Sequence, residues 1–189
     1  ESMHVVGMSM GGMISQALTI NHPTKVRSLC SVMSNTGDRR NGGISLKLIR
    51  AMGLPKPPGS KETAVEDSLA LWCHISGDHF DADETRQRAE AGLERSWCPD
   101  GVMRQAAAIG GSDDRTAGLR NVKAPSLVIH GLKDLLVAPS GGTATAAAIP
   151  GSRLLMFPDM GHNLPEPRQD EMVAAIVRNT LRTSVGDGV

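Results

Sequence analysis

The stretch HVVGMSMGGM, residues 4–13, places a serine between two glycines directly after an apolar run. The β-branched Val5 and Val6 are typical of a buried strand, and the apolar residues after Ser9 recur at helical spacing. Residues 7–11 therefore have the pattern G-x-S-x-G between a strand and a helix. We predict a sharp strand-to-helix turn with a strained serine at its tip. Both glycines should be required, because a Cβ at either position would strike neighbouring backbone.

Strand and helix patterns alternate at the start of the chain and again near its end. Strands are predicted at residues 3–8, 25–33, 125–131 and 152–158, and helices at residues 10–22, 140–150 and 169–181. This alternation predicts an α/β fold, in which a mostly parallel sheet has helices on both faces. Four strands make a thin sheet, so we expect that N-terminal strands are lacking from this chain. The last helix should bury one side, formed by Met172, Ile176, Val177 and Leu181.

The middle of the chain has a different texture. Gly- and Pro-rich breaks separate amphipathic helices predicted at residues 44–52, 61–76, 81–97 and 100–109, with no strand pattern between them. We therefore expect a partial α/β core made of residues 1–33 and 121–189. Residues 34–120 should form a helical cap inserted into that core.

Composition and charge exclude several classes of partner. Lysine and arginine together number 20, as do aspartate and glutamate, so no broad basic field is present to attract nucleic acid or anionic lipid. The longest apolar runs are far shorter than the roughly 20 residues of a membrane span. Cys30, Cys73 and Cys98 match no zinc-binding spacing. Buried reduced thiols in a cytoplasmic protein are expected, with a Cys73–Cys98 disulfide as the alternative.

Two further residues follow strand ends and fit the chemistry of Ser9. A serine hydroxyl is a poor nucleophile until a base removes its proton, and the base needs a carboxylate to orient it. The segment MGHNLP supplies His162 after the last predicted strand, and HGLKD supplies Asp134 after the third. Because parallel strands all end at one edge of the sheet, the three side chains should converge there. Their chain order, Ser, Asp, His, is that of hydrolases with this type of turn.

Each residue also has a simpler interpretation. His162 could be an ordinary loop histidine and Asp134 a turn residue. Asp38, which follows the second predicted strand, is an alternative acid, whereas Asp159 should shape the loop of His162 and His130 should be structural. Four other residues are ligand-like but lack a metal-binding spacing, and are expected at a solvated helix end: His74, Asp78, His79 and Asp81. We therefore expect no metal and no cofactor.

The segments GMSMGG, PSLVIHGLKDLLV and FPDMGHNLPEP resemble the α/β-hydrolase fold family, serine esterase type. The resemblance covers residues 1–33 and 121–183 and implies that Ser9 is the nucleophile, Asp134 the acid and His162 the base. It also implies that the Met10 N–H contributes to an oxyanion hole, with a second donor from a loop N-terminal to this chain.

We expect the substrates of such a site to be small. The segment SGDHFDADETRQRAEAGLER is weakly similar to methyl ester hydrolases of the aclacinomycin methylesterase type. We expect hydrolysis of small carboxylic esters through an acyl-enzyme, with Met8 and Leu136 lining the substrate pocket. The alternatives are thioester, lactone, C–C bond or perhydrolysis chemistry on the same triad, or a truncated scaffold that binds a small ligand without turnover. A second copy could pair with the exposed first strand to form a homodimer.

Overall fold

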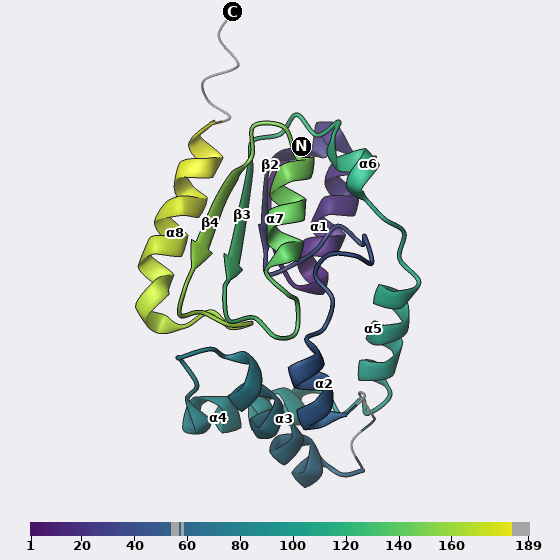
Figure 1. Cartoon of the computed structure of the whole chain (residues 1–189), viewed down its shortest axis with the longest axis vertical. Coiled ribbons are helices and arrows are strands. Elements are labelled where there is room, and N and C mark those ends of the chain that lie inside the picture. The colour runs from purple at the N-terminus through teal and green to yellow at the C-terminus, as the bar shows by residue number, and fades with distance from the viewer. Residues whose placement is uncertain (54–56, 58, 183–189) are drawn as a thin grey trace, which may run out of the picture.

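The structure is a computed structural model that describes residues 1–53, 57 and 59–182. A four-stranded parallel sheet in the order β1-β2-β3-β4 lies at its centre (Figure 1). The strands are β1 (Met3–Met8), β2 (Val26–Val32), β3 (Ser126–Gly131) and β4 (Arg153–Phe157). Each bound lies within one residue of its prediction, because every strand is an apolar run ended by turn residues. The predicted α/β fold class is confirmed.

Helices cover both faces of the sheet (Figure 1). One face carries α1 (Met10–Asn21), which is followed by the 3-10 turn η1 (Pro23–Lys25), and α7 (Ser140–Ala148). The opposite face carries α8 (Glu166–Leu181), which packs on β2 and β3. Alternate residues of β2 enter the two cores, with Leu29 in the cluster around Ile149 and Cys30 in the cluster around Phe157.

The buried faces of α1 and α8 differ from the helical patterns in the sequence. On α8, Met172 is buried as predicted, but Val177 and Leu181 are 49% and 59% exposed, so that part of the prediction is wrong. On α1, Ile14 is exposed, whereas Gln16 is fully buried. The Gln16 amide donates to Ser31 Oγ at 3.0 Å, so the polar group is satisfied inside the fold.

Strand β1 lies at one edge of the sheet and pairs only with β2 among the described strands. The sequence predicted a buried strand, but Met3 is 50% and Val6 is 53% exposed. Burial was therefore the wrong expectation for these side chains and an exposed first strand the correct one, because burial depends on neighbours that an isolated strand pattern cannot reveal. Pairing of two copies along β1 stays a prediction.

The segment between β2 and β3 is helical throughout its regular elements. It contains α2 (Leu46–Met52), α3 (Lys61–Ile75), α4 (Ala82–Arg95), α5 (Gly101–Gly110) and α6 (Thr116–Leu119). Helices α2, α3 and α4 lie beyond the carboxyl ends of the strands, whereas α6 lies beside α1 (Figure 1). Leu119 of α6 is fully buried in the core cluster around Ile149. The division into a core and a 34–120 cap stays a prediction. Helix α6 falls within the predicted cap range but packs against the core helices α1 and α7.

The cysteines are all free, with Cys30 buried and Cys73 and Cys98 exposed. The expectation of buried thiols is therefore wrong for Cys73 and Cys98. Burial raises the pKa of the Cys30 thiol to about 12. Within the described residues, no helix is both long and apolar enough to cross a membrane.

Candidate active site

Ser9 occupies a strained turn between β1 and α1. Its φ is 55°, a left-handed value that is uncommon for a residue with a side chain. The Ser9 N–H donates to the Val32 carbonyl at 2.8 Å, and the Ser9 carbonyl accepts from Gly12 N–H at 2.9 Å as α1 begins. These bonds hold Ser9 at the N-terminus of a 12-residue helix, where free N–H groups favour negative charge. The strained turn predicted from G-x-S-x-G is confirmed.

The glycines around Ser9 are not equivalent. A Cβ on Gly7 would lie 2.1 Å from the Gly11 carbonyl oxygen, so Gly7 is required, as predicted. A Cβ on Gly11 would meet nothing within 4 Å, and the prediction for Gly11 is wrong. The second glycine that the turn requires is Gly12, because a Cβ added there would lie 2.6 Å from the Ser34 Cβ. The close approach is therefore between α1 and the loop after β2.

His162 and Asp134 form a buried pair. His162 Nδ1 lies 2.7 Å from Asp134 Oδ2, and both residues are 3% exposed. A carboxylate only accepts hydrogen bonds, so Nδ1 carries the proton and Nε2 is left with a lone pair. Asp134 Oδ1 accepts from the N–H groups of Leu136 at 2.9 Å and Val137 at 2.8 Å, which fixes the carboxylate plane.

The environment keeps Asp134 ionised. Burial acts to raise the pKa of its carboxyl, but hydrogen bonds from His130 and His162 act against burial. The charge of His162 in its protonated form and the Val137 N–H add to these effects, and the net pKa of Asp134 lies below its usual range. The carboxylate can therefore hold His162 in one tautomer and stabilise its protonated form.

The loop that carries His162 is held by the chain that follows α3. The His162 N–H donates to the Ile75 carbonyl at 2.6 Å. A Cβ on Gly161 would lie 1.9 Å from the same oxygen, so the two loops approach each other closely. His130 is fully buried, with Nε2 2.9 Å from the Val137 carbonyl and 3.5 Å from Asp134 Oδ2. Its contacts are those of a structural residue.

Ser9 reaches the same edge of the sheet as this pair. Strands β1, β3 and β4 are parallel, and Ser9, Asp134 and His162 follow their respective carboxyl ends. Met10 is the first residue of α1, next to Ser9. Met8 packs against the core cluster around Phe157, and Leu136 is half-buried and donates its N–H to Asp134. The predicted pocket roles of Met8 and Leu136 stay predictions.

The alternative acid lies in a different environment. Asp38 is paired with Arg40, whose Nε lies 3.1 Å from Asp38 Oδ1. The side-chain hydrogen bond from Arg40, helped by its N–H, lowers the pKa of Asp38 to about 2. The structure pairs His162 with Asp134 and not with Asp38.

Asp159 links the loop of His162 to the turn after α3. Arg168 donates to its Oδ2 at 2.7 Å and His79 Nε2 lies 2.9 Å from the same oxygen. The hydrogen bond from Arg168, with a smaller contribution from His79, holds the pKa of Asp159 well below its usual range. Asp78 pairs with Lys133, and Asp81 caps α4 by accepting from the Glu84 N–H at 2.8 Å. No group of three potential metal ligands occurs among the described residues.

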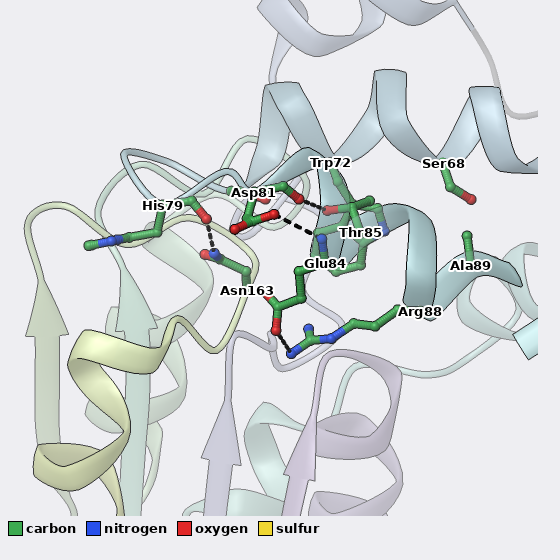
Figure 2. Close-up of a pocket in the computed structure, with 10 residues that line it drawn as sticks. Ser68, Trp72, His79, Asp81, Glu84, Thr85, Arg88, Ala89 and Asn163 are labelled. Atoms are coloured by element: carbon green, nitrogen blue, oxygen red, sulfur yellow. Dashed lines mark hydrogen bonds and ion pairs between the residues drawn. The ribbon is translucent and has the colours of Figure 1, made fainter. Parts of the chain in front are cut away.

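Two hollows lie near these residues. A groove of about 630 Å³ runs between α1 and α5, from Met10 to Ile109. A smaller cavity of about 260 Å³ lies between α3 and α4 and is lined by Asn163, the residue after His162 (Figure 2). Sequence reasoning missed Asn163, and its position directly after His162 was the signal that could have identified it.

Comparison with known proteins decides the family. The profile of the alpha/beta hydrolase fold matches residues 1–168 of this chain. The chain belongs to the α/β-hydrolase fold family. It is 26% identical over 205 residues to rhodomycin D methylesterase DauP of Streptomyces sp. (strain C5), covering 98% of this chain and 69% of the relative. It is 28% identical over 176 residues to a pimeloyl-[acyl-carrier protein] methyl ester esterase of Neisseria meningitidis serogroup A, covering 93% and 55%.

Solved structures show the same fold. A meta-cleavage product hydrolase from Pseudomonas fluorescens IP01 superposes with a TM-score of 0.69 at 18% identity, covering 95% of this chain and 64% of that one. An esterase from Exiguobacterium antarcticum superposes with a TM-score of 0.68 at 21% identity, covering 94% and 66%. The chain thus spans between about half and two thirds of the length of these relatives.

Proposed function

We propose that this chain carries the catalytic centre of a serine hydrolase that cleaves small carboxylic esters. The observation that carries the proposal is the buried His162–Asp134 pair, at 2.7 Å, on the same sheet edge as the strained Ser9. A hydroxyl, an imidazole with a free Nε2 and an ionised carboxylate are the three groups that acyl transfer requires. The assignment of Asp134 rests on its hydrogen bond to His162, which Asp38 lacks.

In the proposed reaction, His162 Nε2 takes the proton of Ser9 while Ser9 Oγ bonds to the ester carbonyl carbon. The carbonyl oxygen becomes negative and accepts a hydrogen bond from the Met10 N–H at the start of α1. The bond between the former carbonyl carbon and the alkoxy oxygen then breaks, and His162 gives its proton to that oxygen, which leaves as the alcohol. Water repeats the sequence on the acyl-enzyme and releases the acid. Asp134 stabilises the imidazolium formed in each half.

Methyl esters are the proposed substrate class. Two kinds of relatives have names that refer to methyl esters: the rhodomycin D methylesterases of Streptomyces, and the pimeloyl-[acyl-carrier protein] methyl ester esterases of Neisseria and Chromobacterium. The departing alcohol would then be methanol, and most of the binding contacts would be made to the acyl group. A cytoplasmic location is part of the same proposal, because free cysteines are typical of reducing compartments.

Covalent labelling tests the nucleophile. A fluorophosphonate probe should label the chain at Ser9, and p-nitrophenyl acetate and butyrate should be hydrolysed. Ser9→Ala should abolish both, because no other group would form the acyl-enzyme. Ser96→Ala, at an exposed serine that ends α4, is the matched control and should retain both. Labelling that persists in Ser9→Ala would refute the assignment.

A further inference from the structure

The turn that follows α3 pairs with the loop that carries His162. This α3 turn comprises residues 76–79. Gly77 of the turn and Met160 of the loop form an isolated antiparallel bridge. Next to the bridge, the His162 N–H donates to the carbonyl of Ile75, the last residue of α3. The loop after β4 is therefore held by a helix that lies between β2 and β3 in the chain.

Gly77 allows the two backbones to approach closely. Its φ of 66° is left-handed, a conformation that favours glycine. A Cβ at this position would lie 2.5 Å from the Asp159 carbonyl oxygen and 2.7 Å from the Gly161 nitrogen. Both atoms belong to the loop of His162, so a larger residue at position 77 would displace that loop from α3.

The His79 side chain adds a second kind of contact to this pairing. Its Nε2 lies 2.9 Å from Asp159 Oδ2, and a carboxylate can only accept, so Nε2 is the donor. Arg168 of α8 donates to the same oxygen at 2.7 Å and holds Asp159 from the other side. The His79 carbonyl accepts from Asn163 Nδ2 at 3.1 Å (Figure 2). His79 therefore contacts the loop on both sides of His162, through Asp159 before it and Asn163 after it.

The α3 turn also reaches the loop that carries Asp134. Asp78 accepts from Lys133 Nζ at 2.6 Å, and Lys133 directly precedes Asp134. This ion pair is about half exposed and adds little by itself. The Lys133 N–H donates to the Met160 carbonyl at 3.0 Å, which joins the two loops directly. The α3 turn therefore contacts the loops of both members of the His162–Asp134 pair.

We propose that the α3 turn positions the base, with Gly77 and His79 as its positioning residues. The inference rests on the proposed function, because it concerns the group that takes the proton of Ser9. His162 lies outside the helices and strands, so its 2.7 Å contact with Asp134 depends on a loop that α3 holds. A displacement of about 1 Å can lower a rate by about 100-fold. The α3 turn should therefore act on the chemical steps and not on the binding of the ester.

Substitutions in the α3 turn test the proposal by the kinetic parameter that they change. For p-nitrophenyl acetate, His79→Ala should lower kcat about 10-fold and Gly77→Ala about 100-fold, with KM within about 2-fold, because the base acts in both halves of the reaction. His79→Gln should restore most of kcat, because its amide nitrogen can donate to Asp159 as Nε2 does. His74→Ala, at an exposed histidine of α3, is the matched control and should leave kcat unchanged.

A spectroscopic readout separates this inference from the catalytic one. Proton and nitrogen NMR of the Ser9→Ala chain requires no turnover. The Nδ1 proton of His162 is buried and bonded to Asp134, so it should give a downfield signal that exchanges slowly with water. That signal should shift or broaden in His79→Ala and Gly77→Ala, and His79→Gln should restore it. This result would support the α3 turn even if Ser9 proves not to be the nucleophile.

Several results would overturn the proposal. One is a His79→Ala chain whose kcat and His162 signal both equal those of the wild type. Others are a rise in KM at unchanged kcat, a loss of kcat with an unchanged His162 signal, and a loss that His79→Gln does not restore. Circular dichroism checks the fold of each variant. If Gly77→Ala does not fold, the two His79 variants suffice, because that side chain is 20% exposed and water can fill the space that it leaves.

Discussion

Asp134→Asn separates the orienting role of the carboxylate from its packing. The substitution keeps the shape of the side chain, so Asn Oδ1 can still accept from the N–H groups of Leu136 and Val137. The new NH₂ group then faces His162 Nδ1 in place of the oxygen that lies 2.7 Å away. Two donors cannot bond to each other, so His162 should move its proton to Nε2. That tautomer cannot accept the proton of Ser9.

We expect a large loss of kcat in Asp134→Asn. An equivalent carboxylate-to-amide change in a Ser-His-Asp triad lowers kcat by about 10⁴-fold, which is about 5.4 kcal/mol of barrier. The free energy of unfolding should fall by a smaller amount, about 1.5–3 kcal/mol, because one hydrogen bond to a charged group is lost. Catalysis and stability therefore respond to different degrees, which a purely structural role would not produce.

Two measurements check this prediction. Hydrolysis of p-nitrophenyl acetate gives kcat, with Asp38→Asn as the control because Asp38 pairs with Arg40 and not with His162. Nitrogen NMR of His162 should show Nδ1 protonated in the wild type and unprotonated in Asp134→Asn, a readout that does not require turnover. A folded Asp134→Asn chain with more than a tenth of the wild-type kcat, or with Nδ1 still protonated, would refute the reasoning.

Three further outcomes are expected. Gly7→Ala should lower the free energy of unfolding by about 3 kcal/mol because its Cβ would lie 2.1 Å from a backbone oxygen, whereas Gly11→Ala, with open space, should change it by no more than about 1 kcal/mol in urea denaturation. Asp159→Asn should be less stable than the wild type at pH 6. Because the folded-state pKa of Asp159 is lowered, the difference in the free energy of unfolding between the wild type and Asp159→Asn should shrink as pH falls below about 4. A difference that stays constant down to about pH 2.5 would contradict this prediction. If two copies pair along the exposed β1, light scattering should show a dimer that Val6→Lys dissociates; a wild-type monomer at micromolar concentration would exclude the pairing.

Much of the fold and of the candidate site could be predicted from local patterns. The strands near Val6, Leu29 and Ile129 are short apolar runs ended by turn residues, so their bounds needed no knowledge of their neighbours. The placement of Ser9 and His162 at one sheet edge follows from their position after parallel strands. The spacing of apolar residues reveals the type and bounds of an element, because the pattern of side chains repeats every two residues in a strand and about every 3.6 in a helix, well within the length of the element.

Only the tertiary structure decided which surfaces are covered and which polar groups are satisfied. The buried amide of Gln16 is satisfied because it donates a hydrogen bond to Ser31 Oγ, while Val177 is exposed because no described element packs on it. Gly11 faces open space, although the motif that contains it suggested a close contact. The free oxygen of Asn163 depends on His79, a residue 84 positions away. These properties belong to pairs of distant residues, and the environment that sets their energies exists only after the chain has folded.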